Sequence, residues 1–211
     1  MDRACEVAAY PTDRETAKRI RALEEFVGEL TILLDDACRR LDRRDRIDAL
    51  SGLANRRAVM ELLDEAWDED RTGETPLSVL LVDVDGLSNV NDAFGPPAGD
   101  RALERVARVM AATLRTDDRA GRLIGDEFLV ILPGTPLDGA LRTAEKIRVA
   151  VSEEFVAFDG GFWQASVSIG VAERAPGLDS PQSLVEIASR GLFTAKTEGR
   201  GRSAAAQAPG A

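Results

Sequence analysis

The sequence predicts an α+β domain, a sheet flanked by helices, with a long helix in front of it. A continuous apolar run at residues 77–85 is typical of a buried central strand. Short apolar segments on either side of Gly125, and again around Asp159-Gly160, carry the signals of strand pairs joined by tight turns. Between these strands, apolar residues recur at steps of three and four, which is the spacing of amphipathic helices.

The N-terminal segment is expected to form a helix from a capping box at residues 12–15 to about residue 44. Its apolar residues follow heptad spacing for about three repeats, at Ile20, Leu23, Val27, Leu30, Leu34, Ala37 and Leu41. We therefore predict that residues 1–46 form a signalling and dimerisation helix of the coiled-coil type. The alternative is a single amphipathic helix lying on the surface of its own domain.

The remaining elements follow in chain order. They are assigned from apolar periodicity and from turn and capping residues, as a helix at 100–114, strands flanking Gly125, a helix at 137–151, a strand pair at 155–158 and 161–163, a strand at 164–172, and a helix from Ser180-Pro181 to about Lys196. The Ala-rich tail, residues 204–211, is expected to be disordered.

Composition excludes several classes of protein. The chain has 211 residues and a net charge of −10, which argues against a general nucleic-acid binder. It has no histidine, so histidine-dependent zinc sites and Ser-His-Asp triads are excluded. The two cysteines are far apart, and no signal peptide or membrane-length apolar run is present. We therefore expect a cytoplasmic protein that does not insert into membranes.

Four acidic residues fall where two of the predicted strands end. Asp83 and Asp85 close the buried run, and Asp126 and Glu127 follow Gly125 at the tip of a hairpin. If the strands are neighbours, three carboxylates converge, and such a set suits Mg²⁺ or Mn²⁺ acting on a nucleoside triphosphate. Gly125 would let the backbone approach a phosphate closely. The alternative for each acid is an ordinary surface turn residue.

Four segments in order carry a resemblance to a known family. They are DALSGLANR at 48–56, VDVDGLSNVNDAFGPPAGD at 82–100, IGDEF at 124–128 and AKTEGRGR at 195–202. From residue 48 to residue 202 the chain resembles the GGDEF domain of diguanylate cyclases. The resemblance implies a GGDEF domain over residues 47–203, with a nucleotidyl-cyclase-like, mostly antiparallel central sheet flanked by helices.

The same resemblance implies an activity, namely condensation of two GTP molecules to cyclic di-GMP with release of pyrophosphate. Each domain would carry one GTP, which implies a homodimer formed through the N-terminal helix. Another signalling protein stays open as a partner. The implied site residues are Asp126 and Glu127 for catalysis, Asp83, the Val84 carbonyl and Asp126 for Mg²⁺ or Mn²⁺, and Asn91, Asp100, Gly125, Lys196 and Arg200 for the substrate.

An RxxD motif precedes the signature. Arg115 and Asp118 have the spacing of the family's product-binding inhibitory site, which binds cyclic di-GMP. An arginine fork can pair a guanine edge or a phosphate. The alternative is a helix-terminal arginine followed by a turn acid.

Several positions depart from the family pattern. Ile124 replaces the first glycine of the signature, Ser88 a lysine on the phosphate side, Pro96 a histidine and Gly201 an asparagine. If Ile124 had a positive φ, the cost would be about 1–3 kcal/mol, whereas an isoleucine that simply ends a strand would cost less. These departures imply reduced activity. The alternative function is a catalytically inactive domain that acts as a receptor for GTP or cyclic di-GMP.

Overall fold

The computed structural model describes residues 46–69 and 75–207, together with Lys18, Phe26, Val27 and Glu29. The chain divides into two compact units, residues 1–45 and 46–211, close to the expected boundary at 46/47. The predicted N-terminal helix lies outside the described residues except for the four single ones, which are helical. Its pairing with a second copy therefore stays a prediction.

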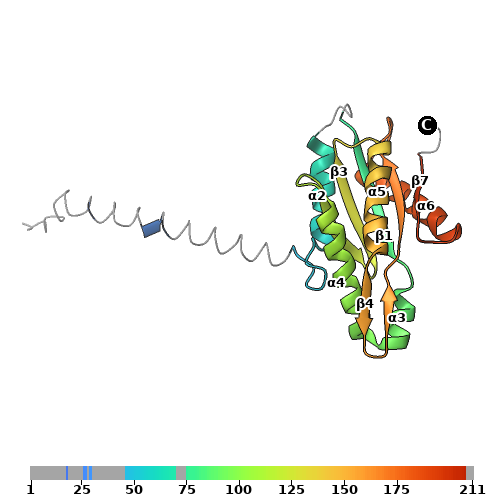
Figure 1. Cartoon of the computed structure of the whole chain (residues 1–211). Helices are drawn as coiled ribbons and strands as arrows, with labels where there is room; N and C mark the ends of the chain where they lie inside the picture. The colour runs from blue at the N-terminus through green and yellow to red at the C-terminus, as the bar shows by residue number, and fades with distance from the viewer. Residues whose placement is uncertain (1–17, 19–25, 28, 30–45, 70–74, 208–211) are drawn as a thin grey trace, which may run out of the picture. The chain divides into compact units, whose positions relative to one another are not determined.

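The second unit is built on a five-stranded sheet in the order β2-β3-β1-β6-β7 (Figure 1). The strands are β1 (Leu77–Val84), β2 (Arg119–Ile124), β3 (Glu127–Pro133), β6 (Val167–Glu173) and β7 (Ser203–Ala205). Only β6 and β7 are parallel, and the other neighbouring pairs are antiparallel. A separate hairpin is formed by β4 (Phe155–Phe158) and β5 (Gly161–Gln164). The predicted α+β class and the mostly antiparallel sheet are confirmed.

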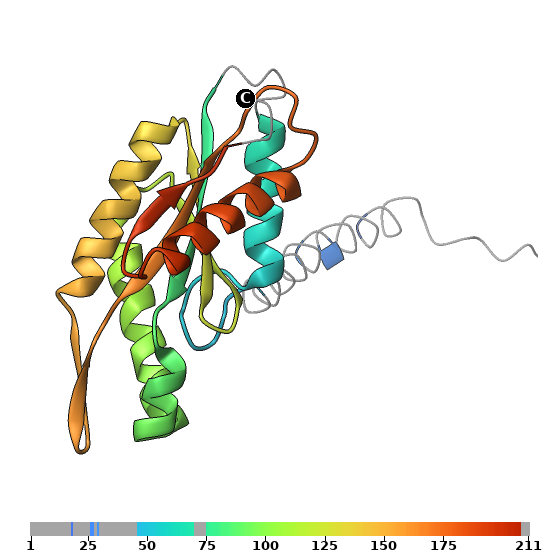
Figure 2. The same ribbon diagram turned by 90° about the vertical axis from the view of Figure 1, so that its right-hand side faces the viewer.

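Helices cover both faces of this sheet (Figure 2). They are α2 (Arg56–Glu69), α3 (Leu87–Phe94), α4 (Pro96–Thr113), α5 (Leu137–Ser152) and α6 (Pro181–Thr197). One apolar core joins α4 and α5 to the sheet, and a second joins α2 and α6 to its other face. Successive residues of β1 point alternately into the two cores, so every residue of this strand is buried. None of the helices among the described residues could cross a membrane.

The structure corrects some of the predicted boundaries. Helix α4 begins at Pro96 instead of residue 100, because two prolines occupy its first turn, where no intrahelical N–H bond is lost. Gln164 ends β5, and β6 starts only at Val167. Helix α2 was not predicted.

The expectation of a disordered tail is wrong for its first residues. Ala204 and Ala205 lie in β7, which pairs with β6. The Ile169 N–H donates to the Arg202 carbonyl at 2.9 Å, and the Ala206 N–H donates to the Val171 carbonyl at 3.0 Å. Small side chains suit this strand, because α6 packs closely beside it.

Candidate functional site

The main chain brings the signature turn against the end of β1. Asp83 lies opposite Glu127 in the register of β1 and β3. The Val84 N–H donates to the Asp126 carbonyl at 3.2 Å, so the turn is bonded to β1 at the residue after Asp83. The neighbouring strands therefore bring these four residues to one edge of the sheet, as expected.

Asp83 is a buried carboxylate whose charge is balanced by a lysine. Its Oδ2 accepts a bond from Lys196 Nζ at 2.6 Å, reaching across from the last turn of α6. Burial raises the pKa of Asp83, and the nearby charges of Asp126 and Glu127 raise it further, while Lys196 opposes this shift. An ionised Asp83 therefore needs a cation beside it, and Lys196 supplies that charge here.

The donors at this edge fit a magnesium ion, but not as a three-carboxylate set. Within the described part of the chain, no three acidic or cysteine side chains are grouped to hold a metal ion, although Asp126 and Glu127 lie near enough to Asp83 to raise its pKa. What remains is the carboxylates of Asp83 and Asp126 with the Val84 carbonyl. Magnesium in proteins is usually held by one or two carboxylates together with substrate phosphates and water. This smaller set of hard oxygen donors matches that pattern.

Asp85 does not join the acidic edge. It follows the last residue of β1, and its carboxylate accepts bonds from Ser166 Oγ at 2.7 Å and Ser168 Oγ at 2.8 Å. It also accepts the Gly201 N–H at 3.1 Å. Two carboxylates spaced by one residue therefore have different partners, because Asp83 faces Lys196 and Asp85 faces β6 and the loop after α6.

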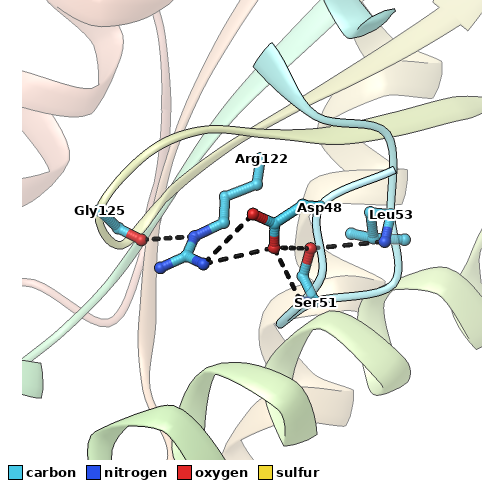
Figure 3. Close-up of polar contacts among 5 residues, drawn as sticks. All are labelled: Asp48, Ser51, Leu53, Arg122 and Gly125. Atoms are coloured by element: carbon cyan, nitrogen blue, oxygen red, sulfur yellow. Dashed lines mark hydrogen bonds and ion pairs between the residues drawn. The ribbon is translucent and has the colours of Figure 1, made fainter. Parts of the chain in front are cut away.

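A polar network connects the DALSGLANR segment at residues 48–56 to the turn of the IGDEF signature at residues 124–128 (Figure 3). Arg122 Nε donates to the Gly125 carbonyl at 2.8 Å, and its Nη1 lies 3.3 Å from Asp48 Oδ1. That same oxygen accepts the Ser51 N–H at 2.8 Å and the Ser51 hydroxyl at 2.7 Å. Asp48 thus fixes Arg122, and Arg122 holds the carbonyl before Asp126. No role for Asp48 or Arg122 could be predicted from local patterns, because their contact spans 74 positions.

Asp48→Asn is expected to reduce stability in a pH-dependent way. Partial burial raises the pKa of Asp48, but the bonds from Ser51 and the charge of Arg122 outweigh it and lower the pKa below its ordinary value. A carboxyl with a lowered folded pKa stabilises the fold above its unfolded pKa, and this contribution is lost as pH falls through the folded pKa. In urea unfolding, the free energy of unfolding of Asp48→Asn should be about 1–2 kcal/mol lower than that of the wild type at pH 7. This difference should become smaller below about pH 4.

Asp117→Asn is the matched control, since Asp117 is an exposed acid in the turn before β2. It should leave stability nearly unchanged at every pH. A deficit in Asp48→Asn that is equally large at pH 3 and pH 7 would contradict a role for the ionised carboxylate.

Ile124 ends β2 without backbone strain. It pairs with Glu127 in the register of β2 and β3, and its side chain is 61% exposed. Among the described residues other than glycine, only Arg200 has a positive φ, while Gly125 in the turn has a φ of 56°. The signature therefore places its required glycine at Gly125, and Ile124 occupies the less costly of the two expected conformations.

Ile124→Gly is expected to destabilise the domain slightly. No strain is relieved, and glycine in a strand costs about 0.5–1 kcal/mol of free energy of unfolding. Thermal unfolding of Ile124→Gly should show a small decrease in melting temperature. Gly125→Ala should also lower the melting temperature, because alanine is strained at the positive φ of this position. An increase in the melting temperature of Ile124→Gly would mean that the isoleucine is strained after all.

The two expected guanine-reading residues lie on adjoining helices. Asn91 is on α3 and Asp100 is on α4, and the two helices pack together. A Cβ added to Gly99 would lie 2.0 Å from Asn91 Oδ1, so the asparagine side chain rests on the backbone next to Asp100. Pro96, which replaces the family's histidine, instead opens α4.

The loop after α6 places a second basic residue near Lys196. Arg200 has a φ of 59°, and its N–H donates to the Ala195 carbonyl at 3.1 Å, closing the end of the helix. Gly201 has a φ of 60°, a conformation that asparagine also tolerates, so the change from the family's asparagine leaves this turn intact.

The RxxD motif forms the turn between α4 and β2. The Arg115 N–H donates to Asp118 Oδ2 at 2.9 Å, and the Asp118 N–H donates to the Arg115 carbonyl at 3.2 Å. The Arg115 side chain is exposed, and the Asp118 side chain is half-buried. The motif is therefore a closed turn that leaves the Arg115 guanidinium without an acceptor among the described residues.

Comparison with protein families gives one match, to the model described as "Diguanylate cyclase, GGDEF domain", over residues 45–202. The chain is 37% identical over 143 residues to diguanylate cyclase A of Treponema denticola, and 39% identical over 155 residues to the response regulator PleD of Caulobacter vibrioides. These alignments cover 67% and 72% of this chain. They cover only 38% and 34% of the two relatives, so the chain spans about a third of their length.

Solved structures agree with this match. The GGDEF domain of DgcB from Caulobacter crescentus, in complex with c-di-GMP, aligns with a TM-score of 0.73 and 34% identity, covering 76% of this chain and 93% of that one. Diguanylate cyclase SiaD of Pseudomonas aeruginosa, in complex with its activator SiaC, aligns with a TM-score of 0.76 and 30% identity, covering 92% and 74%. The family match covers strands β1 to β6, the acidic edge and the loop after α6, and the chain belongs to the GGDEF family of diguanylate cyclase domains.

Proposed function

We propose that the protein condenses two GTP molecules to cyclic di-GMP and releases pyrophosphate. The observation that carries the proposal is the buried Asp83 carboxylate beside the signature turn, paired with Lys196 at 2.6 Å. A buried acid whose partner is a lysine, a cation on a long flexible stem, is suited to exchange that partner for a metal-bound nucleotide. Family membership and the similarity to cyclases and to a c-di-GMP complex support the same reaction.

In this proposal, Asp83, Asp126 and the Val84 carbonyl hold Mg²⁺ or Mn²⁺, which neutralises charge on the phosphates when bound. Lys196, whose Nζ bonds Asp83 in this structure, would bind the terminal phosphates, which need a cationic partner.

The remaining roles belong to the nucleotide and its partner. Asn91 and Asp100 bind the guanine edge, and Gly125 leaves room for the phosphates. Glu127 accepts the proton of the ribose 3′-hydroxyl, whose oxygen attacks the α-phosphate of the second GTP as pyrophosphate leaves.

The reaction needs two domains, each with one GTP. We propose that residues 13–44 pair two copies, because their heptad spacing suits a coiled coil. A second protein could act on the same segment, since the similar cyclase SiaD was crystallised with an activator protein.

The direct test is to incubate the purified protein with GTP and Mg²⁺ and to separate the products by chromatography. Cyclic di-GMP and pyrophosphate are expected in a ratio of about one to two, from the stoichiometry of the proposed condensation. Unchanged GTP after prolonged incubation at high protein concentration, with the fold intact, would contradict the proposal.

The receptor alternative rests on the RxxD turn, whose Arg115 guanidinium has no acceptor in the described part of the chain and is available to bind cyclic di-GMP. Calorimetry should detect cyclic di-GMP binding, and Arg115→Ala should weaken it by about 10- to 100-fold, because hydrogen bonds to charged groups contribute about 1.5–3 kcal/mol. Arg108→Ala, an exposed arginine on α4, is the control. Binding that is unaffected by Arg115→Ala would exclude this turn as the site.

A further inference from the structure

Asp85 is a buried carboxylate that the proposed reaction does not use. It is 8% exposed, and three donors bond it, namely Ser166 Oγ, Ser168 Oγ and the Gly201 N–H. The serines come from β6 and from the residue before it, whereas Gly201 lies in the loop after α6. Asp85 therefore joins the end of the central strand to a loop more than a hundred positions further along the chain.

The loop that Asp85 fixes has an unusual backbone. Gly199, Arg200 and Gly201 have φ values of 117°, 59° and 60°. Among the described residues, Arg200 is the only residue with a side chain in this left-handed region, which is unfavourable for residues other than glycine. Such conformations persist only where the surroundings hold them, and they cluster at functional sites.

Two hydrogen bonds fix the main chain at Arg200, one from its own N–H and one from the N–H of the next residue. Its own N–H donates to the Ala195 carbonyl at 3.1 Å, and the next N–H, that of Gly201, donates to Asp85 at 3.1 Å. No acceptor among the described residues bonds the Arg200 guanidinium. Asp85 is two residues after Asp83, so the bond to Gly201 anchors this loop at the sheet edge where Lys196 meets Asp83.

We propose that Asp85 is a positioning residue that holds Arg200 in its left-handed conformation, so that its guanidinium meets the terminal phosphates of the bound nucleotide. This inference rests on the proposed function, because it requires a triphosphate at the acidic edge. The competing explanation is that Asp85 only fastens β7 to the sheet, in which case its loss would act on stability and not through Arg200.

A double-mutant cycle separates these explanations. The affinity of a non-hydrolysable GTP analogue with Mg²⁺ is measured by calorimetry for the wild type, Asp85→Asn, Arg200→Ala and the double variant. Arg200→Ala should weaken binding about 10-fold or more, as expected for a lost charge-assisted contact. Asp85→Asn should weaken it to a similar extent, and the double variant should bind no more weakly than Arg200→Ala alone.

A second pair of variants separates an effect on nucleotide binding from a general loss of stability. Ser168→Ala removes one bond to Asp85, and Ser78→Ala removes a matched buried hydroxyl that bonds the Thr135 carbonyl at the other end of β1. Both serines are fully buried, so both variants should lose similar stability, but only Ser168→Ala should weaken analogue binding, and only when Arg200 is present.

The outcomes are distinct. If the wild type binds no analogue, the proposed function fails, and this inference with it. If the wild type binds but the effects of Asp85→Asn and Arg200→Ala multiply, or if Asp85→Asn and Ser168→Ala bind normally, the inference alone is overturned.

Discussion

Asp126→Ala is expected to reduce the rate of cyclic di-GMP formation by at least about 100-fold, because even outer partners of a metal site cost 10- to 100-fold when they are removed. The fold should survive, since the bond that joins the turn to β1 is accepted by the Asp126 carbonyl and not by its side chain. Turnover with GTP and Mg²⁺ is the measurement, alongside thermal unfolding.

Asp92→Ala serves as the control, because Asp92 is an exposed acid on α3. It should retain close to the full rate. An Asp126→Ala variant that keeps more than a tenth of the wild-type rate would show that this carboxylate is not needed for the reaction.

Gly170→Ala is expected to have the largest effect on stability. Gly170 lies in β6 under α6, and an added Cβ would sit 2.0 Å from the Ala188 carbonyl oxygen and 2.3 Å from the Leu192 nitrogen. Both obstacles are backbone atoms of α6, so the helix itself must move. Overpacking of this kind costs about 1–3 kcal/mol or more, and urea unfolding should show a loss at the upper end of that range or an unfolded protein.

Gly134→Ala is the matched comparison. Gly134 has a φ of 62° and no atom within 4 Å of an added Cβ, so only conformational strain is expected, about 1–2 kcal/mol. Equal losses at the two positions would mean that α6 can shift away from β6 without cost.

Strand and helix types were largely predictable, because they depend on local patterns. The buried run at β1, the helical spacing of α5 and the Ser180 cap of α6 could each be assigned from neighbouring residues alone. In the structure, Ser180 Oγ accepts the Ser183 N–H at 3.2 Å, as its position before Pro181 indicated.

The short strand β7 could not be assigned in this way. Its three residues carry no alternation, and only pairing with β6 makes them a strand. The small residues of this segment are typical of a disordered tail, but here they allow β7 to pack closely against α6.

For the candidate site, too, the residues within one motif could be predicted, but the contacts between distant segments could not. The predicted strands placed Asp83, Asp126 and Glu127 at one edge if they were neighbours, and the pairing of β1 with β3 brings them there. The sequence did not predict the ion pair between Lys196 and Asp83 or the ion pair between Arg122 and Asp48. It also did not predict that Asp85 would accept a hydrogen bond from the loop after α6. These contacts join residues between 74 and 116 positions apart, and their partners are set by the packed fold and not by any local spacing.

We propose that the edge formed by Asp83 and Asp126 binds GTP through a divalent ion. The most direct measurement is the affinity of a non-hydrolysable GTP analogue with Mg²⁺ and with a chelator in its place, in the wild type and in Asp126→Ala. We expect the wild type to bind at least about 10-fold more tightly with Mg²⁺, as for a charged ligand shared with the phosphates, and Asp126→Ala to lose that difference. An affinity that is the same with and without Mg²⁺ in the wild type would contradict the claim.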